Sequence, residues 1–209
     1  VPPAIADVQL SMPAAVLAAA EDASTEIARF DAEAGTEIAP FSAILLRSES
    51  AASSKIENLT ASARAIAEAE LGHGSRNAVL IVANERAMSA AIALADRLDG
   101  PAILDMHDAL LHDSAPAIAG RWRDQQVWIG GGDHSPHAAQ FVPPHHERVP
   151  AAMRDLVVFM RRDDIPALVQ ATVAHAQFET IHPFPDGNGR TGRALIHSLL
   201  RAKRLTRTV

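Results

Sequence analysis

The stretch Phe178–Arg193, which reads FETIHPFPDGNGRTGR, decides how the rest of this chain is interpreted. It places an imidazole, a carboxylate, a glycine-rich turn and two guanidinium groups within sixteen positions. Polar and charged groups gathered in this way are costly to hold together unless a ligand compensates them. The stretch therefore predicts a binding site for a polyanion, and more specifically an active site that handles phosphate groups.

The Gly187–Gly189 turn, followed directly by a helical pattern, is predicted to bind the phosphates. Glycine permits positive φ and lets backbone N–H groups converge on an anion, and the N-terminus of the following helix adds partial positive charge. Arg190 and Arg193 are three residues apart, so both guanidinium groups can point along one helix face. We expect a di- or triphosphate as the ligand. The predicted phosphate-binding residues are Gly187, Asn188, Gly189, Arg190 and Arg193.

Two neighbouring side chains supply the remaining chemistry. Asp186 is unsuited to bind phosphate directly but suits Mg²⁺, which commonly couples one carboxylate to substrate phosphates. His182 follows a predicted helix, and its imidazole could take a proton from an attacking hydroxyl near neutral pH. Phe184, which lies between them, is predicted to anchor the loop on the core. A base, a metal carboxylate and an anion site together predict group transfer at phosphorus.

Composition predicts a single-domain cytoplasmic protein. The chain has 209 residues of which 48% are hydrophobic, enough for one substantial core. A formal net charge of -6 argues against general nucleic-acid binding, although the run RAKRLTR near the C-terminus is basic. The absence of cysteine excludes disulfides and cysteine nucleophiles and fits a reducing compartment. No apolar run approaches the ~20 residues of a membrane span, and the start at Val1, without signal-peptide features, fits a processed or trimmed chain.

Helical periodicity dominates the chain. Helices are predicted at about 12–31, 48–71 with a break near Asn58, 75–98, 101–120, 148–161, 165–181 and 190–204. Within 75–98 the run AVLIVA alone could be a buried strand, but the length and alanine content favour a helix. Residues 120–142 contain both tryptophans and three consecutive glycines, and they predict a short β-hairpin flap. The expected fold is mainly α, with one small β-hairpin.

Residues 182–193, HPFPDGNGRTGR, resemble the Fic family motif H-x-F-x-(D/E)-G-N-G-R-x-x-R at every specified position. The resemblance extends to AHAQFETIHPF upstream, to GRWRDQQVWIGG in the flap and to QFVPPHHERVPAAMRDLVVFM after it. It covers most of the chain from about Ser48 onward. It implies a Fic domain at 48–209, with residues 1–47 as an N-terminal helical region packed on its core, and the two are expected to form one structural unit.

The resemblance implies protein AMPylation, in which AMP is transferred from ATP to a Ser, Thr or Tyr hydroxyl of a target protein and pyrophosphate is released. By this analogy His182 deprotonates the hydroxyl, and Asp186 holds Mg²⁺ between the α- and β-phosphates. Backbone amides of residues 187–190 would hold the phosphates, with Arg190 and Arg193 toward the β- and γ-phosphates. The flap would clamp the target segment as an added strand. The flap residues implied in this docking are Val127, Trp128, Ile129 and Gly130.

The segment SSKIEN, residues 53–58, resembles the family's inhibitory motif (S/T)-x-x-x-E-(G/N), with Ser53, Glu57 and Asn58 at the specified places. In relatives that carry it, the glutamate pairs with the second motif arginine, here Arg193, and blocks the γ-phosphate. A carboxylate on that arginine competes with an anionic ligand. The alternative is a capping box, in which Ser54 and Glu57 begin a helix. We expect the chain to be autoinhibited through Glu57.

Other functions stay open at this point. The same site could remove AMP or transfer another phosphate-containing group, or the chain could be a non-catalytic nucleotide-binding regulatory or toxin-like module. The target could be this chain itself, and a homodimer is open.

The remaining histidines and tryptophans are predicted to be structural or solvated. His134, His137, His145 and His146 lack regular ligand spacing and cysteine neighbours, so they are predicted to be solvated or flap residues and not a metal cluster. His175 and His197 are assigned supporting hydrogen bonds, and Trp122 and Trp128 are expected to pack the flap.

Overall fold

The computed structural model describes residues 2–131 and 136–207, and α-helices account for most of them. The helices in these ranges are α1 Ala14–Ile38, α2 Ser42–Ile56, α3 Ala63–Glu70, α4 Arg76–Ala93, α5 Gly100–Leu111, α6 Val149–Met160, α7 Ala167–Ile181 and α8 Asn188–Ala202. Short 3₁₀ turns lie at η1 Ala39–Phe41, η2 Ala95–Arg97, η3 Pro136–Ala138 and η4 His146–Arg148. The predicted mainly α class is confirmed.

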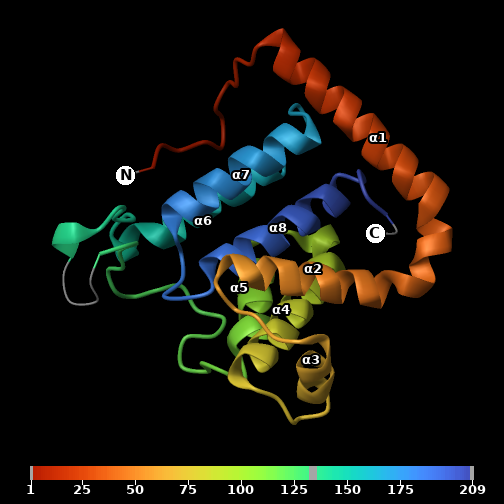
Figure 1. Cartoon of the computed structure of the whole chain (residues 1–209). Helices are drawn as coiled ribbons and strands as arrows, with labels where there is room; N and C mark the ends of the chain where they lie inside the picture. The colour runs from red at the N-terminus through yellow and green to blue at the C-terminus, as the bar shows by residue number, and fades with distance from the viewer. Residues whose placement is uncertain (1, 132–135, 208–209) are drawn as a thin grey trace.

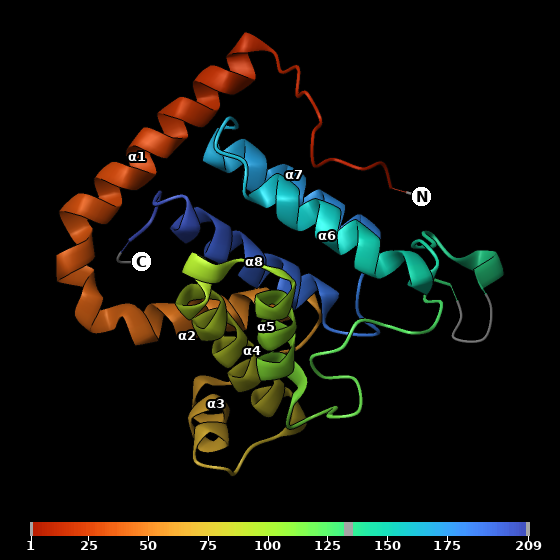
Figure 2. The same ribbon diagram turned by 180° about the vertical axis from the view of Figure 1, so that it is seen from behind.

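Helix α8 lies at the centre of the fold. In both ribbon views it runs between the α6–α7 pair on one side and the α4–α5 pair on the other, and it packs against α7, α4, α5 and α2 (Figures 1 and 2). Ala194, Leu195 and Leu199 of α8 are buried in the main core, together with Phe178 of α7 and Phe184. This packing places the N-terminus of α8 in the middle of the molecule, next to the ends of α2 and α7.

Side-chain caps set several helix starts. Ser62, Ser75 and Asp99 occupy the N-cap positions of α3, α4 and α5, and each side chain accepts a hydrogen bond from the N–H three residues later. The run AVLIVA thus lies in a helix and not in a strand, as the sequence predicted, although α4 ends at Ala93 and a 3₁₀ turn follows at Ala95–Arg97. Helix α5, in contrast, ends at Leu111 and does not continue through residue 120, because Pro116 has no N–H to donate and residues 112–119 form turns.

The C-terminus of α2 corrects the capping-box prediction. Ser54 lies in the last turn of α2 and Glu57 is its C-cap, whereas α3 begins only after Ser62. Asn58 adopts a left-handed φ of 59° and its N–H donates to the carbonyl of Lys55 at 3.0 Å, while Leu59 N–H donates to the carbonyl of Ser54 at 3.1 Å. This pair of bonds is a Schellman motif. Asparagine tolerates the positive φ, so the chain can stop the helix immediately after Glu57.

The predicted β-hairpin flap is wrong in the described part of residues 120–142, which leaves out 132–135. One antiparallel bridge joins Ile129 and Phe141, with Ile129 N–H donating to Phe141 O at 2.8 Å. The next pair in that register would be Val127 and Pro143, but proline has no N–H to donate. The amide of Gln126 donates instead to the carbonyls of Val127 and Pro143, at 3.0 and 2.9 Å. A ladder therefore cannot continue from this bridge on the side of Pro143.

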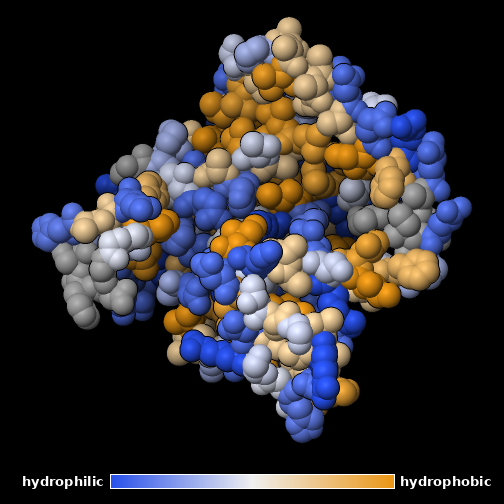
Figure 3. All heavy atoms as spheres, viewed as in Figure 1, coloured by the Kyte–Doolittle hydropathy of each residue, from blue (hydrophilic) through white to orange (hydrophobic). Residues whose placement is uncertain are grey.

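Helix α1 forms a long outer arm that leads from the N-terminal segment to α2 (Figures 1 and 2). Several large apolar side chains are exposed here: Val16 and Phe30 on the arm, and Phe41 and Ile44 near its junction with α2. Figure 3 shows apolar surface along this side of the molecule. Asp31 joins the arm to the C-terminal segment by accepting from Arg207 N–H at 2.9 Å. The division into residues 1–47 and 48–209 stays a prediction.

None of the described helices combines the length and apolar character that crossing a bilayer requires.

Candidate functional site

The loop between α7 and α8 turns the chain so that His182 lies beside the first turn of α8. His182 caps α7 in the left-handed region, with φ 49°, and its N–H donates to Phe178 O at 2.8 Å. Gly187, at φ 78°, occupies the N-cap position of α8. For a non-glycine residue such as His182, the left-handed conformation costs about 1–3 kcal/mol, and it persists only where the surrounding structure enforces it. The backbone is thus fixed in an unfavourable conformation at the predicted base.

Phe184 and Asn188 hold the loop in place. Phe184 is fully buried, and its ring stacks on the ring of His107, with the two ring centroids 3.7 Å apart. The centroid of the Phe184 ring is 5.0 Å from that of Trp122. Asn188 brackets the Phe184 backbone, accepting from its N–H at 2.9 Å and donating to its carbonyl at 2.8 Å. The prediction that Phe184 anchors the loop is confirmed. Asn188 uses its side chain for the same purpose, so its backbone N–H is the group it can present to an anion.

The first turn of α8 has the features of an anion site. The earliest intrahelical bond runs from Thr191 N–H to Gly187 O at 3.0 Å, so the N–H groups of residues 188–190 precede it. The Arg190 side chain is only 6% exposed, and its Nε and Nη1 are buried without a hydrogen-bond partner among the described residues. Burial lowers the pKa of Arg190. Its Nη2 lies 3.7 Å from Asp186 Oδ1, which is too long for a hydrogen bond, and a buried guanidinium is costly unless an anion binds it closely.

A cavity of about 540 Å³ opens onto Arg190. Its apolar wall consists of Leu59, Val79, Leu80, Leu111 and Ala115, and its polar lining of Glu57, Arg76, Ser114, Asp186 and Arg190. The volume is typical of sites for small molecules and cofactors. An apolar wall beside charged groups suits a ligand with a flat, weakly polar part and a polyanionic part. Arg76, which the sequence analysis did not single out, adds a second cation to this cavity.

Arg193 is engaged by the C-terminal turn of α2. Its Nη2 lies 3.0 Å from Glu57 Oε1 and 3.1 Å from the carbonyl of Ser53, and its Nε donates to Ser53 Oγ at 2.7 Å. A Cβ added at Gly189 would lie only 2.3 Å from Glu57 Oε1. Glycine at this position therefore gives the carboxylate room against the first turn of α8. The structure brings Ser53 and Glu57 onto Arg193, while Asn58 ends the helix that presents them.

His182 has a carboxylate neighbour that the sequence analysis missed. Glu179 lies one turn earlier on α7, and its Oε2 is 3.8 Å from Nδ1 of His182. Both His182 Nδ1 and Glu179 Oε1 are buried without a hydrogen-bond partner among the described residues. Burial lowers the pKa of His182, partly offset by the Glu179 backbone carbonyl, and burial raises the pKa of Glu179. The i, i+3 spacing on a helix was the available signal.

Asp186 and the flap residues lie at the outer side of the site. Asp186 lines the cavity, is 66% exposed, and its Oδ1 accepts from Gly187 N–H at 2.6 Å. One exposed carboxylate beside a phosphate-sized anion site fits the way in which Mg²⁺ is usually held. The flap residues Val127, Trp128, Ile129 and Gly130 are half-buried or exposed and do not line this cavity.

His107 of α5 holds the loop between α7 and α8 in position. Gly120 N–H donates to His107 Nδ1 at 3.1 Å, so the proton is on Nε2, which is 3.0 Å from the carbonyl of Asp186. Burial lowers the pKa of His107, in agreement with a neutral ring. The sequence offered no signal for this residue, since its partners lie 13 and 79 positions away.

Arg123 ties the base of the flap to the loop. The residue is 3% exposed, and burial lowers its pKa. Its backbone N–H donates to Pro183 O at 2.9 Å, and its Nε donates to His182 O at 2.8 Å. The guanidinium also donates to the carbonyls of Gln125, Pro144 and Ile181. Arg123 thus donates to the carbonyls of three consecutive residues, Ile181 and His182 through its side chain and Pro183 through its backbone.

Replacing Arg123 with methionine is expected to lower the free energy of unfolding by roughly 3 kcal/mol, because several buried carbonyls lose their donor. Urea denaturation followed by circular dichroism measures the change. Arg121→Met is the matched control, since Arg121 is exposed two positions away and should alter stability by less than about 0.5 kcal/mol. Equal midpoints for the two variants would contradict the role of Arg123.

Residues 97–200 match the Fic/DOC family. Protein adenylyltransferase fic-1 of Caenorhabditis elegans is 34% identical over 101 residues, which are 47% of this chain and 18% of that protein. A probable protein adenylyltransferase of Aquifex aeolicus is 43% identical over 63 residues, 30% of this chain and 20% of that protein. The chain thus spans about a fifth of the length of these relatives.

Solved structures extend the likeness beyond the matched segment. A Fic family protein from Desulfovibrio desulfuricans G20 superposes with a TM-score of 0.72 at 26% identity, covering 93% of this chain and 60% of that one. Fic-1 (residues 134–508) from C. elegans superposes with a TM-score of 0.65 at 22% identity, covering 90% of this chain and 58% of that one, and shows the same fold. Through its α5–α8 region, this chain belongs to the Fic/DOC family.

Proposed function

We propose that this chain transfers AMP from ATP to a hydroxyl-bearing side chain of a target protein. The observation that carries the proposal is the buried guanidinium of Arg190, whose Nε and Nη1 have no hydrogen-bond partner among the described residues. It lies beside the first-turn N–H groups of α8, with His182 at the other end of the same loop. The hydroxyl oxygen would attack the α-phosphorus of ATP, the bond from that phosphorus to the bridging oxygen would break, and pyrophosphate would leave.

His182 is the base in this proposal. Its lowered pKa keeps the ring neutral at physiological pH, so it can accept the proton of the hydroxyl as the new bond forms. The backbone N–H groups of residues 188–190 and the side chain of Arg190 would hold the phosphates, since preorganised donors stabilise developing charge without rearrangement. The cavity wall of Leu59, Val79 and Leu80 would take the base of the nucleotide.

Asp186 would hold Mg²⁺ together with the phosphates of the nucleotide. When bound, the ion would neutralise negative charge on the phosphate oxygens. The exposed Oδ atoms of Asp186 and their position in the cavity next to Arg190 support this assignment.

We propose further that the chain is autoinhibited. Glu57 and Ser53 together take three hydrogen bonds from the Arg193 guanidinium, the group assigned to the γ-phosphate. An anionic phosphate and the Glu57 carboxylate cannot share Arg193 without strong repulsion, so one must displace the other. Glu57 also lies against Gly189, where the phosphate site begins.

Glu179 is proposed as a positioning residue for His182. A carboxylate near Nδ1 favours the tautomer that keeps the proton on Nδ1 and leaves Nε2 to accept one. In a Glu57→Gly background, Glu179→Ala is expected to lower kcat about tenfold while the KM for ATP changes less than about twofold. Glu179→Gln retains an acceptor oxygen and should recover part of kcat. Steady-state transfer assays measure both constants, and a loss confined to KM would contradict the assignment.

The target is proposed to dock on the flap. Residues 127–130 offer backbone groups beyond the single Ile129–Phe141 bridge, and an extended target segment could add to them as a strand. This chain itself and a second copy of it are among the candidate targets.

The direct test uses the Glu57→Gly protein with ATP and Mg²⁺ in cell lysate. We expect mass spectrometry to find an AMP increment on a Ser, Thr or Tyr side chain of a target or of the chain itself. The same reaction with His182→Ala added is the blank. If the folded Glu57→Gly protein transfers nothing from ATP to any protein, the proposal fails.

A further inference from the structure

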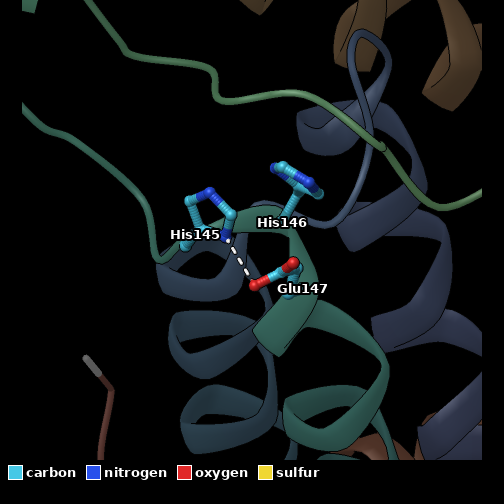
Figure 4. Close-up of side chains that lie close together, drawn as sticks. All are labelled: His145, His146 and Glu147. Carbon is cyan, nitrogen blue, oxygen red and sulfur yellow. Dashed lines mark ion pairs between the residues drawn. The ribbon is translucent and has the colours of Figure 1, made fainter.

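We infer that His145, His146 and Glu147 form a binding site for a divalent transition-metal ion of the Zn²⁺ type. Each residue offers one ligand atom, and these atoms all lie within 4.8 Å of one another. Figure 4 shows the two imidazole rings and the carboxylate gathered just before the start of α6. The inference does not depend on the proposed function.

The backbone brings the three adjacent side chains together. His145 is extended, at φ -53° and ψ 140°, and the chain then enters the 3₁₀ turn at His146. This change of backbone direction places the rings of His145 and His146 with centroids 4.1 Å apart. Nδ1 of His145 lies 3.5 Å from Glu147 Oε2. Two prolines precede the group, and the carbonyl of Pro144 accepts from the buried Arg123. The cluster therefore stands on a fixed backbone.

The donor set selects the class of ion. Two imidazole nitrogens and one carboxylate oxygen suit Zn²⁺, Ni²⁺ or Cu²⁺, whereas Mg²⁺ and Ca²⁺ prefer oxygen ligands alone. Three protein ligands leave at least one coordination position for water or another group. The Nδ1 atom of His146 is buried and has no hydrogen-bond partner among the described residues, so this nitrogen is not committed to another group.

The site needs only side-chain rotation to close. Ligands at the usual Zn–N and Zn–O distances of about 2.0–2.2 Å lie roughly 3.4 Å apart. His145 and Glu147 side chains are 52% and 80% exposed, so both can move by the required amount without disturbing the core. The sequence prediction of solvated histidines considered four residues and left out Glu147. Of those four, His134 lies outside the described residues, and His137 is not part of the group.

Isothermal titration calorimetry of the untagged full chain with ZnCl₂ tests the site, with millimolar Mg²⁺ present to occupy oxygen-only sites. We expect one Zn²⁺ per chain. The double variant His145→Ala/His146→Ala should weaken binding at least tenfold, and Glu147→Gln should weaken it to a smaller extent. His112→Ala is the matched control, because His112 faces Asp108 at 3.4 Å as an exposed pair that lacks a second imidazole. Its removal should leave the affinity unchanged.

Circular dichroism distinguishes loss of the site from loss of the fold. His145 and Glu147 are exposed and His146 is half-buried, so the variants should keep the wild-type spectrum. Absorption of bound Co²⁺ gives a second reading, with d–d bands in the wild type and the control but not in the double variant. Absence of Zn²⁺ binding by the wild type would overturn the inference. So would binding that is unchanged in the double variant, or that falls equally in His112→Ala.

Discussion

Replacing Glu57 with glycine is expected to raise the rate of AMP incorporation by about 10- to 100-fold. The carboxylate is 3.0 Å from Arg193 Nη2 and lies against Gly189, so it occupies the guanidinium that the γ-phosphate would use. A hydrogen bond between charged groups contributes about 1.5–3 kcal/mol, and each 1.4 kcal/mol is a tenfold change in an equilibrium. The bonds that end α2 are backbone bonds of Asn58 and Leu59, so the substitution should leave the end of the helix in place.

Incorporation of AMP labelled at the α-phosphate, including automodification, measures this effect. Asp164→Gly is the matched control, because Asp164 is an exposed carboxylate that pairs with Arg162 at 2.6 Å far from α2 along the chain. It should leave the rate at the wild-type level. Equal rates for wild type and Glu57→Gly, with both proteins folded and binding ATP, would remove Glu57 from the inhibitory role and leave the transferase proposal standing.

The parts of the site that could be predicted from the sequence are those set by local geometry. The glycine turn and the helix that follows it depend on neighbouring residues, and Gly187 has the positive φ that the turn required. The helical spacing of Ile165, Leu168 and Val169 predicted a helix at 165–181, and α7 spans Ala167–Ile181. Chemistry that fits in one loop is visible in one stretch of sequence.

The remaining parts depend on contacts between distant residues. Arg123 donates to the carbonyls of Pro144 and Ile181, and His107 donates to the carbonyl of Asp186. No periodicity in the sequence reveals such contacts between distant residues. The hairpin prediction failed for a related reason, because strand propensity was present at Val127 and Ile129 but the partner strand carried Pro143. Propensity describes one strand, whereas a ladder needs a donor on each of two strands. The Glu57–Arg193 contact was reached through the resemblance to a family, not through spacing, since 136 positions separate the two residues.

Replacing His182 with alanine in the Glu57→Gly background is expected to lower kcat by about 10²- to 10⁴-fold, the usual contribution of a general base. ATP binding should change little, because the anion site is formed by α8 and Arg190 and not by the imidazole. Transfer assays measure kcat and titration calorimetry with ATP measures nucleotide binding, so both on the same preparation separate an effect on catalysis from an effect on binding. His112→Ala, an exposed histidine on the α5 side, should retain full activity. Loss of ATP binding and transfer in equal measure would make His182 a structural residue of the loop.

The pH dependence gives the same assignment a second check. A base must be neutral to act, and burial lowers the pKa of His182 below the ordinary value of 6.5. The fraction of neutral imidazole therefore stays high as the pH falls through 6.5, and the acid limb of kcat/KM for Glu57→Gly should lie below that value. The negative charges of Glu57 and Asp186 raise this pKa, so removing Glu57 should move the limb further toward acid. A limb at or above 6.5, or one that persists unchanged in His182→Ala, would assign the titration to another group.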